Sequence, residues 1–137
     1  MEKAPRQAYG VYSVLLTLHF FAHVLDGATT PIMSFIAKRG NKNIEADLGL
    51  FYQNTEFGKE KREIIFAECK TYNRFVKKDI DRLKILASAF PGSIIVFSTL
   101  NSSLTINEKK LIRPFVKKGN VRYDHFRSSG ECAGGLI

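Results

Sequence analysis

Apolar and polar residues follow two different spacings along this chain, and each spacing predicts a type of element. Where apolar residues recur every three or four positions, or form one long run, we expect helices. Where they form short runs bounded by turn residues, we expect strands. These patterns predict helices at residues 11–27, at residues 74–90 after an N-cap at Asn73, and from Thr105 or Asn107 to about residue 118. They predict strands at residues 32–37, 44–52, 63–70 and 93–100.

The predicted elements follow the order α-β-β-β-α-β-α, which indicates an α/β chain. The third strand, the second helix and the fourth strand should form a right-handed parallel crossover. The run SIIVFSTL at residues 93–100 is almost continuously apolar, as expected of a strand buried on both faces. A chain of 137 residues is long enough for one domain. We therefore expect a single domain over residues 1–127 and a weakly ordered tail, SSGECAGGLI, over residues 128–137.

The apolar run at residues 11–25 also resembles a signal peptide or a membrane anchor. It is shorter than the roughly 20 residues that a membrane span needs. Asp26-Gly27-Ala28 is a poor cleavage context, so a buried helix is favoured and no membrane partner is expected. A membrane-associated interaction protein is the alternative. His19, His23 and Asp26 share one helical face and offer a metal site as a further alternative, without the glutamate of an HExxH motif.

Composition adds a charge bias and a redox setting. The chain has 21 Lys and Arg residues against 13 Asp and Glu residues, a net charge of +8. This excess favours a polyanionic partner, nucleic acid before an anionic membrane, although a basic and inert surface is the simpler alternative. Cys69 and Cys132 form no CxxC motif, so neither a zinc knuckle nor a disulfide framework is predicted. A reducing, cytoplasmic setting fits best.

Charged residues occupy positions where a central strand would ordinarily be apolar. Glu68 and Lys70 share one face of the third predicted strand, and Cys69 points to the other, because side chains alternate along a strand. Burying an acid and a lysine is costly unless they pair or bind a metal. Asp47 on the neighbouring strand adds a second acid, and the set would bind a hard divalent cation and activate water for phosphodiester cleavage. An ordinary ion pair at a strand end is the alternative.

This order of elements resembles the core of the PD-(D/E)xK nuclease superfamily over residues 8–117. The residues that carry the resemblance are Asp47 after Glu45-Ala46, and Glu68-Cys69-Lys70 just before an amphipathic helix and a strand. Residues 66–100 look most like the nuclease domains of bacterial restriction and DNA-defence proteins. The resemblance implies a restriction-endonuclease-like fold, which is a three-layer core with a mixed central sheet.

The resemblance also implies a Mg²⁺-dependent DNA endonuclease, with Mn²⁺ as a substitute for Mg²⁺. Its catalytic residues would be Asp47, Glu68 and Lys70, of which Asp47 and Glu68 ligate the metal together with the backbone carbonyl of Cys69. Lys70 would orient or activate the attacking water. The chain departs from the family pattern because its first helix has no evident acidic ligand, and Glu45 is the candidate substitute. A non-catalytic nucleic-acid-binding domain with an incomplete metal site is therefore the alternative.

Residues beside the strand end and in a basic turn are candidates for DNA contacts. At the strand end these are Tyr72, Asn73, Arg74, Lys77 and Lys78, and in the turn they are Lys38 and Arg39. The alternatives are packing for Tyr72 and solubility for the basic turn. We expect DNA as the partner, and one module of a restriction or defence system that works as a homodimer or within a larger assembly.

Overall fold

The computed structural model describes residues 6–25, 27–54, 60–116, 121–126 and 132–135. Within them the chain forms three helices and six strands, which follow one another in this order: α1 (Arg6–Val24), β1 (Ala28–Arg39), β2 (Lys42–Asn54), β3 (Lys61–Lys70), α2 (Lys77–Ala89), β4 (Ile94–Thr99), α3 (Ile106–Val116), β5 (Val121–Phe126) and β6 (Cys132–Gly135). The predicted order α-β-β-β-α-β-α is confirmed for the first seven elements.

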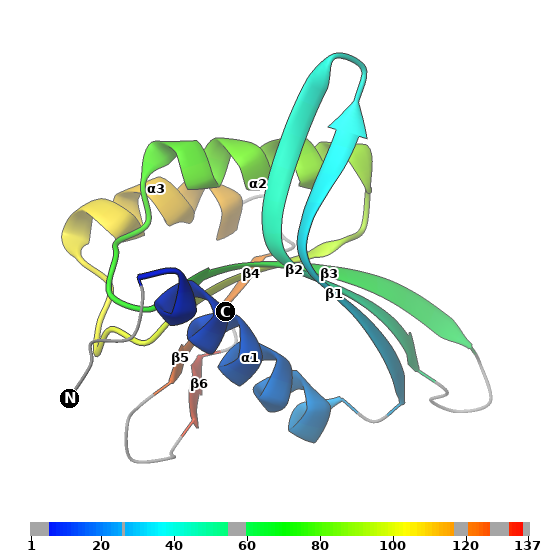
Figure 1. Cartoon of the computed structure of the whole chain (residues 1–137), viewed down its shortest axis with the longest axis horizontal. Coiled ribbons are helices and arrows are strands. Elements are labelled where there is room, and N and C mark those ends of the chain that lie inside the picture. The colour runs from blue at the N-terminus through cyan, green and yellow to red at the C-terminus, as the bar shows by residue number, and fades with distance from the viewer. Residues whose placement is uncertain (1–5, 26, 55–59, 117–120, 127–131, 136–137) are drawn as a thin grey trace.

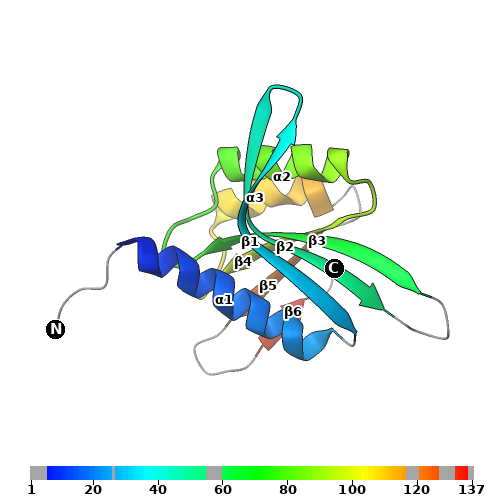
Figure 2. The same cartoon turned by 45° about the vertical axis from the view of Figure 1, so that its right-hand side comes forward.

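The strands form one mixed sheet between two layers of helix. The sheet has the order β1-β2-β3-β4-β5-β6. The pairs β3–β4 and β4–β5 are parallel, as the predicted crossover requires for the first of them, and the other pairs are antiparallel. Helix α1 lies on one face of the sheet, and α2 and α3 lie on the other (Figures 1 and 2). This is the three-layer α/β core that the sequence predicted.

Strands β5 and β6 have no counterpart among the predicted elements. β6 occupies four residues of the segment that was expected to be a weakly ordered tail, and it pairs with β5. The other residues of that segment, and the expected end of the third helix at about residue 118, lie outside the described residues.

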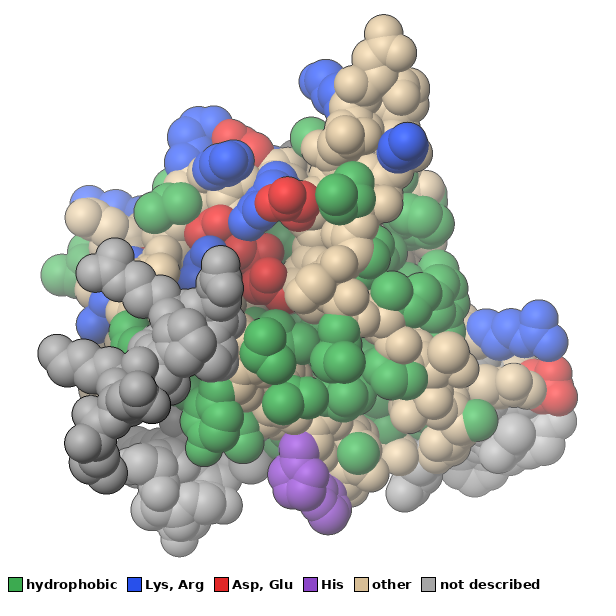
Figure 3. All heavy atoms as spheres, in the orientation of Figure 1, with side chains coloured by type: hydrophobic (Ala, Val, Ile, Leu, Met, Phe, Trp, Pro, Cys, Tyr) green, Lys and Arg blue, Asp and Glu red, His purple; other side chains and the backbone are tan. Residues whose placement is uncertain are grey.

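The hairpin of β1 and β2 leaves the sheet halfway along its length. The β1–β2 ladder skips one position, Ser34, whose backbone has a φ of 50°. The β2–β3 ladder ends at the pair Leu48–Ala67, and the tip of the hairpin projects beside α2 (Figures 1 and 3). Ile44 near the tip packs with the side chains of α2, whereas Leu48 packs on the α1 side. Asp47 therefore lies where β2 departs from the sheet.

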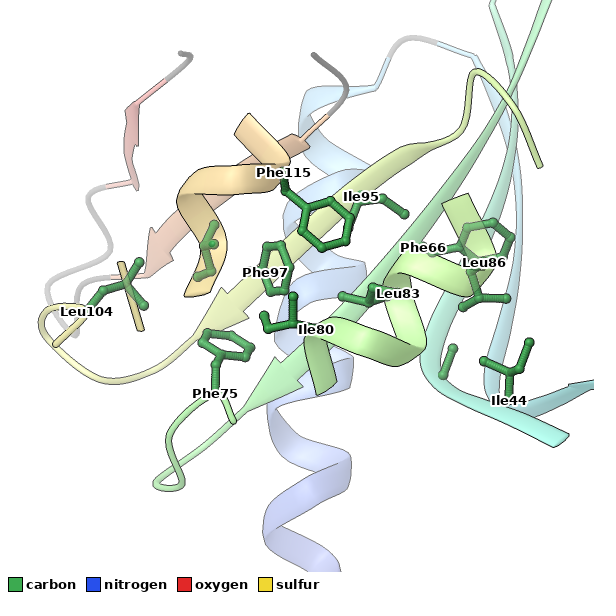
Figure 4. Close-up of a cluster of buried hydrophobic side chains, with 12 residues drawn as sticks. Ile44, Phe66, Phe75, Ile80, Leu83, Leu86, Ile95, Phe97, Leu104 and Phe115 are labelled. Atoms are coloured by element: carbon green, nitrogen blue, oxygen red, sulfur yellow. The ribbon is translucent and has the colours of Figure 1, made fainter. Parts of the chain in front are cut away.

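Each face of the sheet has its own apolar core. On the α2 side, Phe66 and Phe97 of the sheet pack against Leu83 of the helix (Figure 4). On the α1 side, Val96 packs with Val14 of the helix. Strand β4 contributes to both cores, so the prediction of a strand buried on both faces is confirmed.

Strand β1 begins earlier than predicted. The first strand was predicted to start at residue 32, but β1 starts at Ala28 and includes Pro31, which pairs with Leu50. Proline lacks an N–H, which a strand tolerates at the edge of a sheet, and β1 is an edge strand. The helix before it ends at Val24, and a Cβ at Gly27 would lie 2.3 Å from the carbonyl oxygen of Gln53. Glycine is therefore required where the chain passes from α1 to β1.

Helix α1 is buried on one side only. Val14 and Phe21 pack in the core, whereas Val11, Tyr12 and Leu15 are exposed. The expectation of a buried helix therefore holds for the side that faces the sheet. No helix among the described residues is both long and apolar enough to cross a membrane.

The predicted N-cap at Asn73 is wrong. Helix α2 begins at Lys77 with Val76 as its N-cap. The Asp79 carboxylate accepts a hydrogen bond from the Val76 N–H at 3.0 Å, so the helix satisfies an end group with a side chain from its own first turn. This bond also fixes the Asp79 side chain close to the end of β3.

Candidate active site

Four acidic and two basic side chains meet beside the point where β2 leaves the sheet. They come in pairs from three elements: Glu45 and Asp47 from β2, Glu68 and Lys70 from β3, and Asp79 and Arg82 from α2. Figure 3 shows acidic and basic side chains gathered between the projecting hairpin and α2. The fold thus assembles one charged cluster from residues that are far apart in the sequence.

Asp47 is fixed against the backbone of β3. Because the β2–β3 ladder ends at Leu48–Ala67, the Cys69 N–H has no backbone partner on β2 in that ladder. The Asp47 carboxylate accepts this hydrogen bond instead, with 2.7 Å between Oδ2 and the nitrogen. The bond holds Asp47 next to Glu68, as the sequence predicted, and the negative charge of Asp47 contributes to the raised pKa of Glu68.

Glu68 is a buried carboxylate with one unused oxygen. Its Oε1 accepts hydrogen bonds from Lys70 Nζ at 2.9 Å and from Arg82 Nη2 at 2.8 Å. Its Oε2 is buried and has no hydrogen-bond partner among the residues that the structure describes. Burial, followed by the charge of Asp47, raises the pKa of Glu68 from 4.5 to about 7, although Lys70 and Arg82 act in the opposite direction. Glu68 therefore has an oxygen that is open to a ligand. Its raised pKa also means that Lys70 and Arg82 do not fully offset burial and the charge of Asp47, so a further cation would stabilise the ionised carboxylate.

Lys70 is held in its charged form between two carboxylates. Its Nζ lies 2.9 Å from Glu68 Oε1 and 3.1 Å from Asp79 Oδ2. Burial alone would lower the pKa of Lys70, but the hydrogen bonds and charges of Glu68 and Asp79 outweigh burial and raise it. Lys70 can therefore supply a fixed positive charge and hydrogen-bond donors, but it is a poor proton acceptor.

Cys69 turns its side chain away from this cluster. Its Sγ lies 3.4 Å from the Thr17 hydroxyl on α1, and Thr17 in turn donates to the Ser98 hydroxyl or accepts from it at 2.7 Å. Burial raises the pKa of the Cys69 thiol to about 12, so the thiol stays protonated. The side chain thus belongs to the packing between α1 and the sheet, as the alternation along β3 predicts.

Two residues of the cluster were not predicted. Arg82 Nη2 lies 2.8 Å from Asp79 Oδ1 as well as 2.8 Å from Glu68 Oε1. Asp79 is buried, and the hydrogen bonds from Val76 and Lys70 hold its pKa below the usual value, although burial acts to raise it. Their positions in the helical repeat could have indicated both residues, because Asp79 and Arg82 each directly precede a fully buried side chain, Ile80 or Leu83.

The cluster fits a hard divalent cation in its chemistry. Mg²⁺ prefers oxygen ligands and retains several waters, so two carboxylates can suffice. Glu68 Oε2 is a buried oxygen without a partner, and Asp47 is fixed on the adjacent strand. In the described part of the chain, however, no group of three His, Cys, Asp or Glu side chains is arranged to hold a metal. Glu45, the candidate additional ligand, is largely exposed and lies 3.4 Å from Arg82 Nη1.

The histidine pair on α1 is a separate feature. The Nε2 atoms of His19 and His23 lie 3.2 Å apart on the exposed side of the helix. Asp26, which would complete the alternative metal site, lies outside the described residues. The pair therefore does not extend the charged cluster.

The predicted DNA-contact residues near the strand end differ in their surroundings. Arg74 donates a hydrogen bond to the Ser103 carbonyl at 2.8 Å and lies 3.4 Å from Glu108, so it ties two loops together. The Asn73 carbonyl accepts a hydrogen bond from the Asn101 side chain at 3.2 Å. Both residues thus have partners within the fold.

The remaining predicted contact residues are exposed. They are Tyr72 after β3, Lys77 and Lys78 at the start of α2, and Lys38 and Arg39 on the projecting hairpin. Lys77 pairs with Asp81 one turn along the helix. The hairpin and α2, which both contribute residues to the charged cluster, thus also present exposed basic side chains.

Comparisons with known proteins identify the fold. Neither a protein-family model nor a curated protein sequence matches this chain. Among solved structures, the chain is similar to the MspJI restriction endonuclease in complex with a 27-mer oligonucleotide, with 11% sequence identity and a TM-score of 0.51. The match covers 88% of this chain and 26% of that chain, so this chain spans about a quarter of the MspJI length. The chain therefore has a restriction-endonuclease-like fold.

Proposed function

We propose that this chain is a Mg²⁺-dependent DNA endonuclease domain, with Mn²⁺ as a substitute metal. The observation that supports the proposal is the placement of Asp47, Glu68 and Lys70. The Asp47 carboxylate is bonded to the main chain of Cys69, directly after Glu68, and Lys70 lies 2.9 Å from Glu68. This set lies where β2 leaves the sheet of a fold that is similar to that of a restriction endonuclease.

Each residue of the set has a distinct role in phosphodiester hydrolysis. Asp47 and Glu68 would hold the cation, together with the carbonyl of Cys69. When bound, the metal supplies Lewis acidity and lowers the pKa of a coordinated water. Lys70, which stays protonated, would orient the attacking water and stabilise negative charge that develops on the phosphate.

Asp79 would act through Lys70 and not on the substrate. Its Oδ2 accepts from Lys70 at 3.1 Å while also accepting from the Val76 N–H at 3.0 Å. The helix start therefore fixes the position of the lysine ammonium group. Fixed donors of this kind stabilise a transition state without reorganising during the reaction.

DNA contacts would come from the basic groups beside the cluster. Lys38 and Arg39 project on the hairpin, and Tyr72, Lys77 and Lys78 are exposed near the end of β3. The similar MspJI structure contains an oligonucleotide, which supports a nucleic-acid partner. Because such cations release counterions when they neutralise phosphates, binding to duplex DNA should weaken steeply as the salt concentration rises.

A specific observation favours a second function, a non-catalytic nucleic-acid-binding domain on the same fold. Arg82 already lies 2.8 Å from Glu68, and no three acidic, histidine or cysteine side chains are arranged to hold a metal ion in the part of the chain that the structure describes. Such a domain would bind DNA with the same salt dependence but would not cut it.

Plasmid cleavage with Mg²⁺, with Mn²⁺ and with EDTA separates the two functions. The nuclease proposal predicts cleavage with either metal and none with EDTA. Lys70→Ala should lower the cleavage rate about 100-fold or more while DNA affinity stays close to the parent value, because Lys70 is one of many cations for binding. Cys69→Ala is the matched control on the same strand, and its effect should be confined to stability, since its side chain packs against α1.

The outcome for the parent chain decides between the functions. Salt-sensitive DNA binding without cleavage under either metal would support the non-catalytic domain. Cleavage by Lys70→Ala at the parent rate would mean that Glu68 and Lys70 form only a structural ion pair.

A further inference from the structure

Arg82 bridges three carboxylates of the charged cluster. Its Nη2 lies 2.8 Å from Glu68 Oε1 and 2.8 Å from Asp79 Oδ1, and its Nη1 lies 3.4 Å from Glu45 Oε2. These carboxylates come from three different elements, β3, α2 and β2. The guanidinium is thus in direct contact with an oxygen of the carboxylate that is proposed to hold a metal ion.

The contact between Arg82 and Glu68 is not saturated on either side. Arginine and carboxylate groups often pair through two parallel hydrogen bonds, but here Nη2 and Oε1 form a single one. Arg82 Nε is buried without a hydrogen-bond partner, and so is Glu68 Oε2. A cation that binds more than one oxygen could therefore satisfy Glu68 better than the guanidinium does.

The balance of charge in the cluster also favours the binding of a further cation. Among the described residues, four carboxylates, those of Glu45, Asp47, Glu68 and Asp79, face two cations, those of Lys70 and Arg82. The Lys70 side chain is 18% exposed and lies between Glu68 and Asp79, whereas the Glu45 side chain is 69% exposed. The exposed Glu45 carboxylate can thus remain paired with the Arg82 guanidinium if the guanidinium leaves Glu68.

We propose that Arg82 is a resident counter-cation that a divalent metal ion displaces from Glu68, and that the guanidinium then pairs with Glu45. The proposal rests on the proposed function, because it takes Glu68 as a metal ligand. In the absence of metal, Arg82 stabilises the cluster by offsetting the repulsion between its carboxylates. The same positive charge beside Glu68 opposes the binding of the metal.

Competition of this kind is reciprocal. If Arg82 weakens metal binding, metal must weaken the contribution of Arg82 to folding by the same free energy. A residue that only ties α2 to the sheet would instead stabilise the metal-free and the metal-bound protein equally. Metal affinity and stability together therefore distinguish a displaced counter-cation from a structural tie.

Calorimetric titration with Mn²⁺ measures the metal affinity. Arg82→Gln should bind Mn²⁺ at least about tenfold more tightly than the parent chain, within the usual range of coupling between two sites. Lys84→Gln is the matched control, because it removes one positive charge from the same helix at an exposed position. Its effect on Mn²⁺ affinity should stay within about threefold, as is typical of exposed charges.

Thermal unfolding with and without saturating Mn²⁺ measures the contribution of Arg82 to stability in the metal-bound and the metal-free protein. The loss of melting temperature caused by Arg82→Gln should be clear in EDTA and should shrink or vanish with Mn²⁺. If Arg82→Gln does not fold, Arg82→Lys serves instead, since it keeps the charge but cannot contact three carboxylates from two nitrogens. Arg82→Lys should show a smaller gain in Mn²⁺ affinity in the same direction.

The outcomes separate this proposal from the proposed function. If the parent chain binds Mn²⁺ and the Arg82 variants bind it equally or less tightly, the counter-cation role is overturned while a metal-dependent function stands. An equal loss of melting temperature with and without Mn²⁺ overturns it in the same way. If neither the parent chain nor the Arg82 variants bind Mn²⁺, the metal-dependent function itself is wrong and the counter-cation role falls with it.

Discussion

Two glutamates of this protein are buried to the same degree but have opposite surroundings. The side chains of Glu68 and Glu108 are each 2% exposed. Both oxygens of Glu108 are used: Oε1 accepts from the Phe75 N–H at 2.9 Å, and Oε2 accepts from the Thr105 N–H at 2.7 Å and from the Thr105 hydroxyl at 2.8 Å. Glu68 uses only Oε1, which it shares between two cations, and leaves Oε2 without a partner.

The two pKa values differ in the direction that these contacts require. Burial acts to raise the pKa of both carboxyl groups. At Glu108 the hydrogen bonds from Thr105 and Phe75, aided by the charge of Arg74, outweigh burial and hold the pKa below its usual value. At Glu68 burial and Asp47 prevail and raise the pKa to about 7. Hydrogen-bond donors thus surround the structural carboxylate of Glu108, whereas Glu68, the candidate metal ligand, has one oxygen that is not used within the fold.

The largest change in stability is expected from Glu108→Ala. Glu108 caps α3 through a capping box with Thr105 and also accepts from the Phe75 N–H before α2. Its removal leaves buried N–H groups without acceptors, so the free energy of unfolding should fall by about 3 kcal/mol. Urea unfolding measures the loss. A fall of less than about 0.5 kcal/mol would mean that Glu108 is not the clamp described above.

A medium effect is expected from pH on the metal-free protein, and it has opposite signs for the two residues. The pKa of Glu68 rises from 4.5 to about 7 on folding, so its contribution to stability is present below pH 4.5 and is lost as the pH rises towards 7. The pKa of Glu108 is lowered on folding, so its contribution is present above pH 4.5 and is lost as the pH falls below that value.

Urea unfolding from about pH 3 to pH 8 in EDTA tests these signs with isosteric variants. Glu68→Gln should remove a loss of stability between about pH 4.5 and 7, because the amide cannot ionise. Glu108→Gln should remove a loss on the acid side of pH 4.5. If the two variants change the same part of the pH profile, the contrast between the residues is wrong.

The smallest effect is expected from Glu45→Ala. Glu45 is a third glutamate with a single long contact, 3.4 Å to Arg82, and its side chain is 69% exposed. Exposed pairs contribute little, so the free energy of unfolding should change by less than about 0.5 kcal/mol. Cleavage should change by less than about threefold if Asp47 and Glu68 hold the metal without it. A loss of cleavage as large as that expected for Lys70→Ala would make Glu45 an essential ligand.

The local pattern of the sequence predicted the parts of the site that lie on strands. Strand alternation placed Glu68 and Lys70 on one face and Cys69 on the other, and the structure has this arrangement. The spacing also placed the start of the third helix at Thr105 or Asn107, and in the structure Thr105 caps α3 together with Glu108. Such signals are local, and they depend only on the repeat of each element.

The sequence did not predict features that depend on contacts between distant segments. Arg82 was not recognised because its role arises from Glu68, fourteen positions away on another element. The bend at Ser34, which brings Asp47 to the end of the β2–β3 ladder, has no periodic signal. Strands β5 and β6 are short, with the sequences VRYDHF and CAGG, and they are specified by pairing at the sheet edge more than by apolar runs.

Plasmid cleavage by Glu68→Gln and Glu108→Gln, at matched concentrations of folded protein and with Mg²⁺, tests the central claim most directly. Each variant replaces one equally buried carboxylate by an amide of the same shape. Glu68→Gln should lose about 100-fold or more in cleavage rate while melting at or above the temperature of the parent chain at pH 8, because it removes a carboxylate that folding makes harder to ionise. Glu108→Gln should melt at a lower temperature and cut within about threefold of the parent rate. Cleavage by Glu68→Gln at the parent rate, or an equal loss in both variants, would contradict the account.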